Sequence, residues 1–129
     1  ALWLAKLYSS ALTLPYVEDC GVYQPLNVEP ALLERAKRNL AHFDGMYYQE
    51  YFDPDPGVDA ASSLGDVGDD LYDTYQEIRS GLTLHENGQP TEAIWHWAFS
   101  HRIHWGRHAV GALFALHCLH ISKNSENVL

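Results

Sequence analysis

Residues 100–120, SHRIHWGRHAVGALFALHCLH, decide the fold that this sequence predicts. The stretch holds five of the eight histidines of the chain, no proline, and two glycines, Gly106 and Gly111. Glycine weakens a helix without necessarily ending it, and Pro90 suits a first helical turn. We therefore predict one long helix over residues 90–123. Its apolar residues lie on nearly every side, which is typical of a helix in the centre of a bundle.

Three further helices are predicted, over residues 1–13, 30–43 and 64–86. Pro15 ends the first, Pro30 opens the second, and Asn87-Gly88 is a stop signal for the third. Between them, residues 44–63 form a long loop rich in glycine and proline. Four aromatic residues should order this loop against the bundle: Tyr47, Tyr48, Tyr51 and Phe52. The predicted fold class is all-α, a bundle of about four main helices.

Composition narrows the class of protein. With 129 residues and 47% hydrophobic content, residues 1–129 should form a single helical domain. The net charge of −9 excludes general binding to nucleic acid and to an anionic membrane surface. Two cysteines without C-x-x-C spacing favour a reducing, cytoplasmic location. Because the chain begins without methionine, we expect its N-terminus to be incomplete.

His101, His104 and His108 share one face of the predicted long helix and could hold a metal ion. However, the Glu of the hydrolytic H-E-x-x-H motif is absent, and a further ligand would have to come from another helix. The small residue Gly106 also suggests tight helix packing rather than an open site. We therefore interpret these imidazoles as structural and predict no catalytic residue, no cofactor and no bound metal. His117 and His120 lie elsewhere on the helix.

Nine of the seventeen acidic residues lie between Glu50 and Glu77, with no Lys or Arg among them. On the helix predicted at 64–86, four of them form one ridge: Asp66, Asp70, Asp73 and Glu77. This ridge projects broadly opposite the apolar stripe and has no cation nearby in sequence, so we predict a solvated face. The segment Asp53–Asp59 resembles a calcium loop, but the required Gly and Glu are replaced by Val58 and Leu64.

The sequence also resembles a known family. The motifs that carry the resemblance are DDLYDTYQEIRSGL (69–82), AIWHWAFSHRIHWGRHAVGALFALH (93–117) and, more loosely, LAKLYSSALTLP (4–15). They are similar to a bacterial family catalogued as domain of unknown function five thousand and sixty-three. The resemblance implies an all-helical fold and no established activity. It also implies that Trp105-Gly106 is a packing signature, and that His104 and His108 are not a metal site common to the family.

Three functional hypotheses follow. The leading one is a small, non-catalytic helical module that binds a protein, since Tyr and Trp suit interfaces. The acidic flank between Asp53 and Glu77 would favour a partner with a basic surface. The rival is a metal-dependent hydrolase that uses His101, His104 and His108 with a carboxylate such as Asp70 or Asp73. A weaker alternative is a small-ligand pocket beneath the Tyr47–Phe52 segment.

Overall fold

The computed structural model describes residues 1–19, 28–51, 53–58 and 61–126, with side chains up to residue 119. Cys20, Phe52, Asp59 and the His120 side chain therefore lie outside the described residues. The elements are α1 (Leu2–Ala11), α2 (Pro30–Leu40), β1 (Tyr47–Glu50), β2 (Ser63–Asp66), α3 (Val67–Glu86), α4 (Pro90–Ser100) and α5 (Gly106–Glu126). A 3₁₀ turn (Ala41–Phe43) extends α2, and a π-helical turn (His101–Trp105) joins α4 to α5. The all-α prediction is confirmed.

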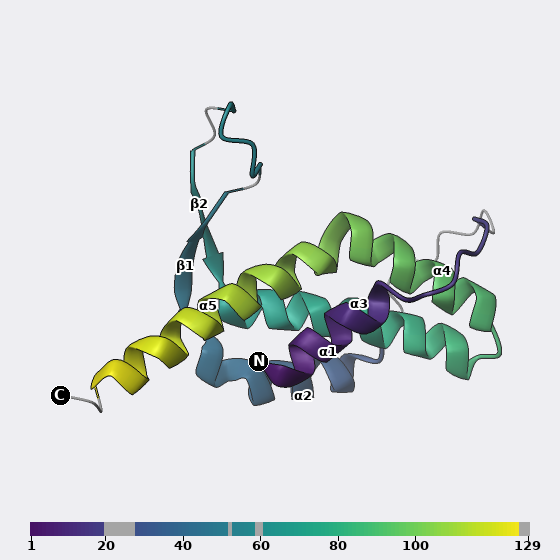
Figure 1. The fold of residues 1–129 in the computed structure, drawn as a ribbon. Helices are drawn as coiled ribbons and strands as arrows, with labels where there is room; N and C mark the ends of the chain where they lie inside the picture. Colours follow the sequence, from purple (N-terminus) through teal and green to yellow (C-terminus); the bar gives the residue numbers. More distant parts are fainter. Residues whose placement is uncertain (20–27, 52, 59–60, 127–129) are drawn as a thin grey trace.

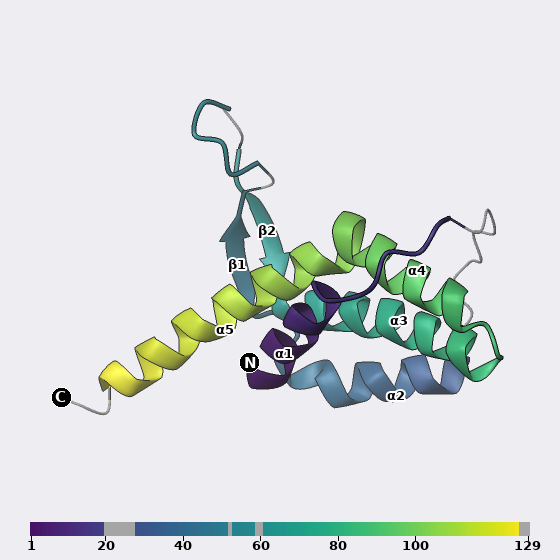
Figure 2. The same ribbon diagram turned by 45° about the vertical axis from the view of Figure 1, so that its right-hand side comes forward.

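Helix α3 forms the centre of the bundle. It packs against α4 and α5 on one side and against α2 on the other, and α1 crosses to contact α5. Figures 1 and 2 show α4 and α5 as two arms of a bent rod above α3, with the end of α5 extending beyond the other helices. None of the helices in the described part of the chain is long and apolar enough to cross a membrane.

The ends of α2 and α3 follow local signals. Pro30 lies at the start of α2, and α2 with its 3₁₀ turn spans the predicted range. Helix α3 ends at Glu86, and Gly88 adopts a positive φ of 76°, as the Asn87-Gly88 stop signal predicts. Its start is later than predicted, at Val67, where the Asp66 carboxylate accepts a hydrogen bond of 2.8 Å from the Gly68 amide.

The segment predicted as a loop over residues 44–63 is partly a β-hairpin. Strand β1 pairs antiparallel with β2, and Tyr47 lies opposite Asp66. In β1 the side chains alternate between exposed and half-buried, which places Tyr48 toward the bundle and Tyr47 toward solvent. Four residues are too few for this alternation to stand out in the sequence. The hairpin projects away from the helices (Figures 1 and 2). The segment was predicted to be ordered, and the pairing of β1 with β2 is what orders it.

The predicted helix over residues 90–123 is interrupted by the π-helical turn. The i→i+5 hydrogen bonds of a π turn accommodate one more residue than an α turn does. A side chain at Gly106 would collide with the backbone carbonyl of His101, so glycine is required where α5 begins. The role of Gly106 is thus local to this turn, and it does not admit a neighbouring helix. Gly111 instead makes room for the hairpin, since the Tyr48 hydroxyl of β1 fills the space of its missing side chain.

Up to residue 119, helix α5 buries only one of its sides, contrary to the prediction of a central helix. Small residues make up that side, so α5 approaches α1 and α3 closely. The buried apolar cluster consists of Leu4, Val67, Trp105, Ala109, Ala112 and Ala115. Val110 and Phe114 point to solvent. The apolar residues on the far side of α5 therefore remain available for contacts outside the bundle.

Candidate metal site

Two carboxylates of the acidic ridge, Asp70 and Glu77, lie inside the protein, so the prediction of a solvated face is wrong for them. Asp70 is 5% exposed and Glu77 is 8% exposed. A buried carboxylate needs hydrogen-bond donors or cations. Here the donors are histidines of α4, α5 and the π turn, which the α3 segment itself could not reveal. Asp70, Asp73 and Glu77 form one polar layer with these histidines, between α3 and the bent rod above it.

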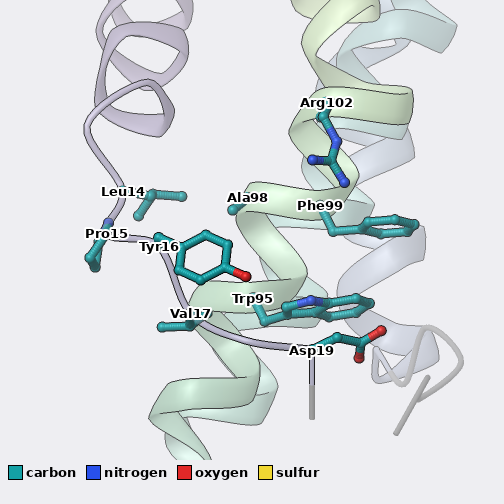
Figure 3. A pocket seen from close by; sticks show the side chains of 9 residues that line it. All are labelled: Leu14, Pro15, Tyr16, Val17, Asp19, Trp95, Ala98, Phe99 and Arg102. Carbon is teal, nitrogen blue, oxygen red and sulfur yellow. The ribbon is translucent and has the colours of Figure 1, made fainter. Parts of the chain in front are cut away.

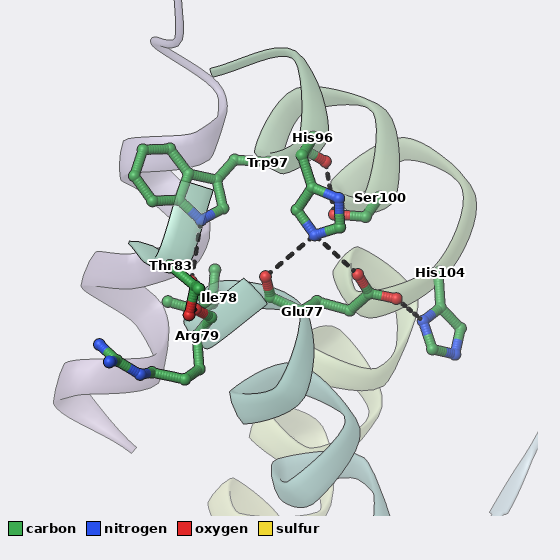
Figure 4. A network of polar contacts seen from close by, with 8 residues as sticks. All are labelled: Glu77, Ile78, Arg79, Thr83, His96, Trp97, Ser100 and His104. Atoms are coloured by element: carbon green, nitrogen blue, oxygen red, sulfur yellow. Dashed lines mark hydrogen bonds and ion pairs between the residues drawn. The ribbon is translucent and has the colours of Figure 1, made fainter. Parts of the chain in front are cut away.

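Glu77 bridges two of these histidines (Figure 4). Its Oε1 lies 2.8 Å from Nδ1 of His104, and its Oε2 lies 3.1 Å from Nε2 of His96. The same His96 nitrogen is 3.1 Å from the backbone carbonyl of Glu77, and the Ser100 hydroxyl donates to the His96 carbonyl. Burial raises the pKa of Glu77, but the two histidine contacts outweigh it and lower the pKa overall. Glu77 is therefore held as a carboxylate.

Asp70 has two donors of its own. Its Oδ1 lies 2.6 Å from Nδ1 of His108, and its Oδ2 accepts a 2.6 Å hydrogen bond from the Tyr48 hydroxyl. The hydrogen bond to Asp70 raises the pKa of His108, against the opposing effect of burial. Burial and the same carboxylate raise the pKa of Tyr48, which keeps its hydroxyl protonated as a donor. Asp70 thus fixes the His108 ring and anchors β1 to α3.

His104 and His108 each have a second ring nitrogen, Nε2, on the more exposed side of the polar layer. With each Nδ1 engaged by a carboxylate, Nε2 of both rings remains for another partner. One donor atom each of Asp73, His104 and His108 lies within 4.8 Å of the others, and His108 Nε2 is 3.8 Å from Asp73 Oδ2. A histidine that binds a metal through one ring nitrogen usually donates a hydrogen bond from its other ring N–H to a carboxylate, which orients the ring. Asp70 and Glu77 have this relation to His108 and His104.

The π turn explains which histidines meet. His96 and His104 are eight residues apart, but the extra residue in the turn makes this equivalent to about seven, or two helical turns. Both rings therefore reach Glu77. His101 is rotated out of the group: its ring lies 4.8 Å from that of Tyr8 and 4.7 Å from that of Trp105. Burial lowers the pKa of His101. The sequence grouped His101, His104 and His108, whereas in the structure His104 and His108 lie together and His101 lies apart from them.

Sequence reasoning missed two members of the layer. His96 has no sequence signal, because a regular helix would turn it away from His104. Tyr48 was assigned only as an apolar anchor of the loop, although its hydroxyl contacts Asp70. The prediction that the histidines bind no metal rested on the missing Glu of H-E-x-x-H, on the need for a ligand from another helix and on the small residue Gly106. The structure supplies a carboxylate from another helix, since Asp73 of α3 lies near His104 and His108.

Two of the hollows formed by the described residues lie on other faces of the bundle. One, of about 460 Å³, lies between residues 14–19 and α4 (Figure 3). Its Trp95 and Phe99 rings stack on each other at 4.8 Å, and Arg102 lies 5.8 Å from the Phe99 ring. Since these groups already contact one another, we assign no ligand to it. The other, of about 660 Å³, lies between β1 and α5, at the place predicted for a small-ligand pocket.

The fold and the polar layer define a class of protein: a small helical bundle whose α3 carboxylates orient histidines from a π-bent helical rod. A profile of the family described as "Domain of unknown function (DUF5063)" matches residues 3–122. The chain therefore belongs to this family, as the sequence motifs suggested. Comparisons with curated proteins and with solved structures gave no match.

Proposed function

We propose that this domain binds a divalent transition-metal ion through Asp73, His104 and His108. One observation carries the proposal: both histidines have Nδ1 bonded to a buried carboxylate, while a donor atom of each ring lies near Asp73. Two imidazoles and one carboxylate are a ligand set for zinc and for non-haem iron. The donor atoms lie within 4.8 Å of one another. Ligand atoms of a tetrahedral zinc lie roughly 3.4 Å apart, so the side chains must close by up to about 1.4 Å.

The site suits such a movement. The side chains of His104 and Asp73 are 42% and 34% exposed, and Asp73 has no short hydrogen bond among the described residues. The buried carboxylates behind the histidines are held firmly by several donors. A metal ion binds an imidazole nitrogen that carries no proton, and because Nδ1–H is donated to a carboxylate, that nitrogen is Nε2 in both rings. The rings are thus fixed at one nitrogen and available at the other.

The test is zinc-dependent stability. Protein purified without a metal-affinity tag and stripped with a chelator should melt at a higher temperature when zinc is added. At 100 times the dissociation constant, the gain is about 2.7 kcal/mol, or roughly 10 °C for a chain of this size. The Asp73→Ala and His104→Ala variants should lose most of this rise, as measured by differential scanning calorimetry.

Matched controls are available on the same helices. Asp69→Ala removes a neighbouring exposed carboxylate of α3, and His117→Ala removes an exposed histidine of α5. Both should keep the full zinc response. An equal response in Asp73→Ala and Asp69→Ala, or no response in the parent protein, would contradict the proposal.

We also propose, as a second function, that a protein with a basic surface docks on the face between β1 and α5. The support is a set of exposed apolar side chains around the hollow there: Tyr47, Tyr51, Phe114 and Leu119. Asp53 and Asp55 lie exposed farther along the hairpin, and the net charge is −9. Because Asp70 and Glu77 are buried, they add little to this acidic flank. The sparse cysteines favour a cytoplasmic partner.

Docking is tested with Phe114→Ser. A partner that is cross-linked to the parent protein in a cell extract should not be cross-linked to this variant, because the apolar contact is removed. It should also not be cross-linked to the parent at high salt, because salt screens the attraction between the charges. Leu12→Ser, which alters an exposed leucine at the end of α1, should capture the partner as the parent does. Retention of the same partner by Phe114→Ser would place the contact elsewhere.

A further inference from the structure

We infer that a metal ion held by Asp73, His104 and His108 keeps coordination positions open to an exogenous oxygen ligand. The site would then be of the catalytic kind, not the structural kind. This inference rests on the proposed metal binding. It concerns what completes the coordination of the ion and which class of small molecule the site accepts.

The described residues offer no further carboxylate oxygen from the polar layer. Asp70 uses Oδ1 for His108 and Oδ2 for Tyr48. Glu77 uses Oε1 for His104 and Oε2 for His96. If either carboxylate turned toward the ion, it would leave a donor unpaired in a largely buried layer, at a cost of about 1–3 kcal/mol for each lost bond. The protein therefore supplies three ligands from this layer.

The open positions face water. The side chain of His108 is 22% exposed, and those of His104 and Asp73 are more exposed still. Structural zinc sites are closed by four protein ligands, whereas catalytic sites have three and an open position. Two histidines and one carboxylate on one side of an ion also leave adjacent positions free. Such positions accept water or a molecule with two oxygen donors, such as a hydroxamate or a carboxylate.

The same geometry limits the chemistry. Asp70 and Glu77 are committed to orienting the histidines, so neither is placed to act as a separate general base. The residues of the site would hold the ion from one side, and the substrate would bind to the ion from the other side. The ion would supply polarisation of a bound carbonyl oxygen, or a water of lowered pKa. The substrate class that fits is a small molecule with a carbonyl or carboxylate group.

The experiment uses the full chain loaded with cobalt(II) in place of zinc, with acetohydroxamate as the probe. The visible absorption of the bound cobalt should change on titration and saturate at one hydroxamate for each cobalt. After gel filtration, cobalt and hydroxamate should both remain with the protein. With zinc, acetohydroxamate should raise the melting temperature above that with zinc alone, because it binds only the loaded, folded protein.

The outcomes separate the inference from the proposed function. If cobalt binds to the parent but not to Asp73→Ala, and its absorption spectrum does not change on adding hydroxamate, the proposed metal site is supported and the open coordination position is refuted. If hydroxamate removes the cobalt from the protein, the inference is also overturned. If no cobalt binds to the parent protein, the proposed function and the inference fail together.

Discussion

Replacing Glu77 by alanine should lower the free energy of unfolding by about 3 kcal/mol. Removing Glu77 leaves two histidine N–H donors without their acceptor in a largely buried layer, at a cost of about 1–3 kcal/mol for each. We expect the lower end because His96 keeps its contact with the Glu77 carbonyl, and His104 can reach water. Urea denaturation followed by circular dichroism measures the change.

The matched control is Glu86→Ala on the same helix. Glu86 pairs with Arg79 at 3.0 Å but is largely exposed, so its removal should cost less than about 1 kcal/mol. Glu77→Gln retains the shape and one acceptor oxygen and should fall between the two. It should also weaken zinc binding by about 10- to 100-fold, since outer-shell partners tune metal affinity. Equal effects of Glu77→Ala and Glu86→Ala would mean that Glu77 is solvated after all.

Replacing Trp105 by alanine should be similarly costly, at about 3–5 kcal/mol. The Trp105 side chain is fully buried and lies in the apolar cluster with Leu4, Val67 and Ala109. The cavity left by an indole cannot be filled by the small residues around it. The loss should appear as a lower denaturation midpoint at an unchanged m-value.

Two further variants separate cavity formation from loss of the indole. The indole N–H of Trp105 is buried with no hydrogen-bond partner among the described residues. Trp105→Phe removes this unpaired donor and leaves a smaller cavity, so it should cost much less than alanine. Trp3→Ala, at an exposed tryptophan of α1, should change stability by less than about 1 kcal/mol. If Trp105→Ala lowered the free energy of unfolding by less than about 1 kcal/mol, the placement of Trp105 in the core would be contradicted.

The site could be predicted only in part from the sequence. His104 and His108 are one turn apart in any helix, so their proximity was predicted correctly. The grouping of His101 with them assumed a regular helix, and the π turn replaces His101 with His96. The burial of Asp70 and Glu77 could not be predicted, because their donors lie 19 or more residues away along the chain.

The sequence by itself determined the helices and most of their ends, because proline, the Asn87-Gly88 stop and apolar periodicity act over a few residues. It also determined the family, since Trp105-Gly106 and the motifs around it are local patterns. Only the tertiary structure decided the pairing of β1 with β2, the bend at His101–Trp105 and the polar layer. These features depend on hydrogen bonds between distant segments, and a single extra residue in one turn selects which side chains meet.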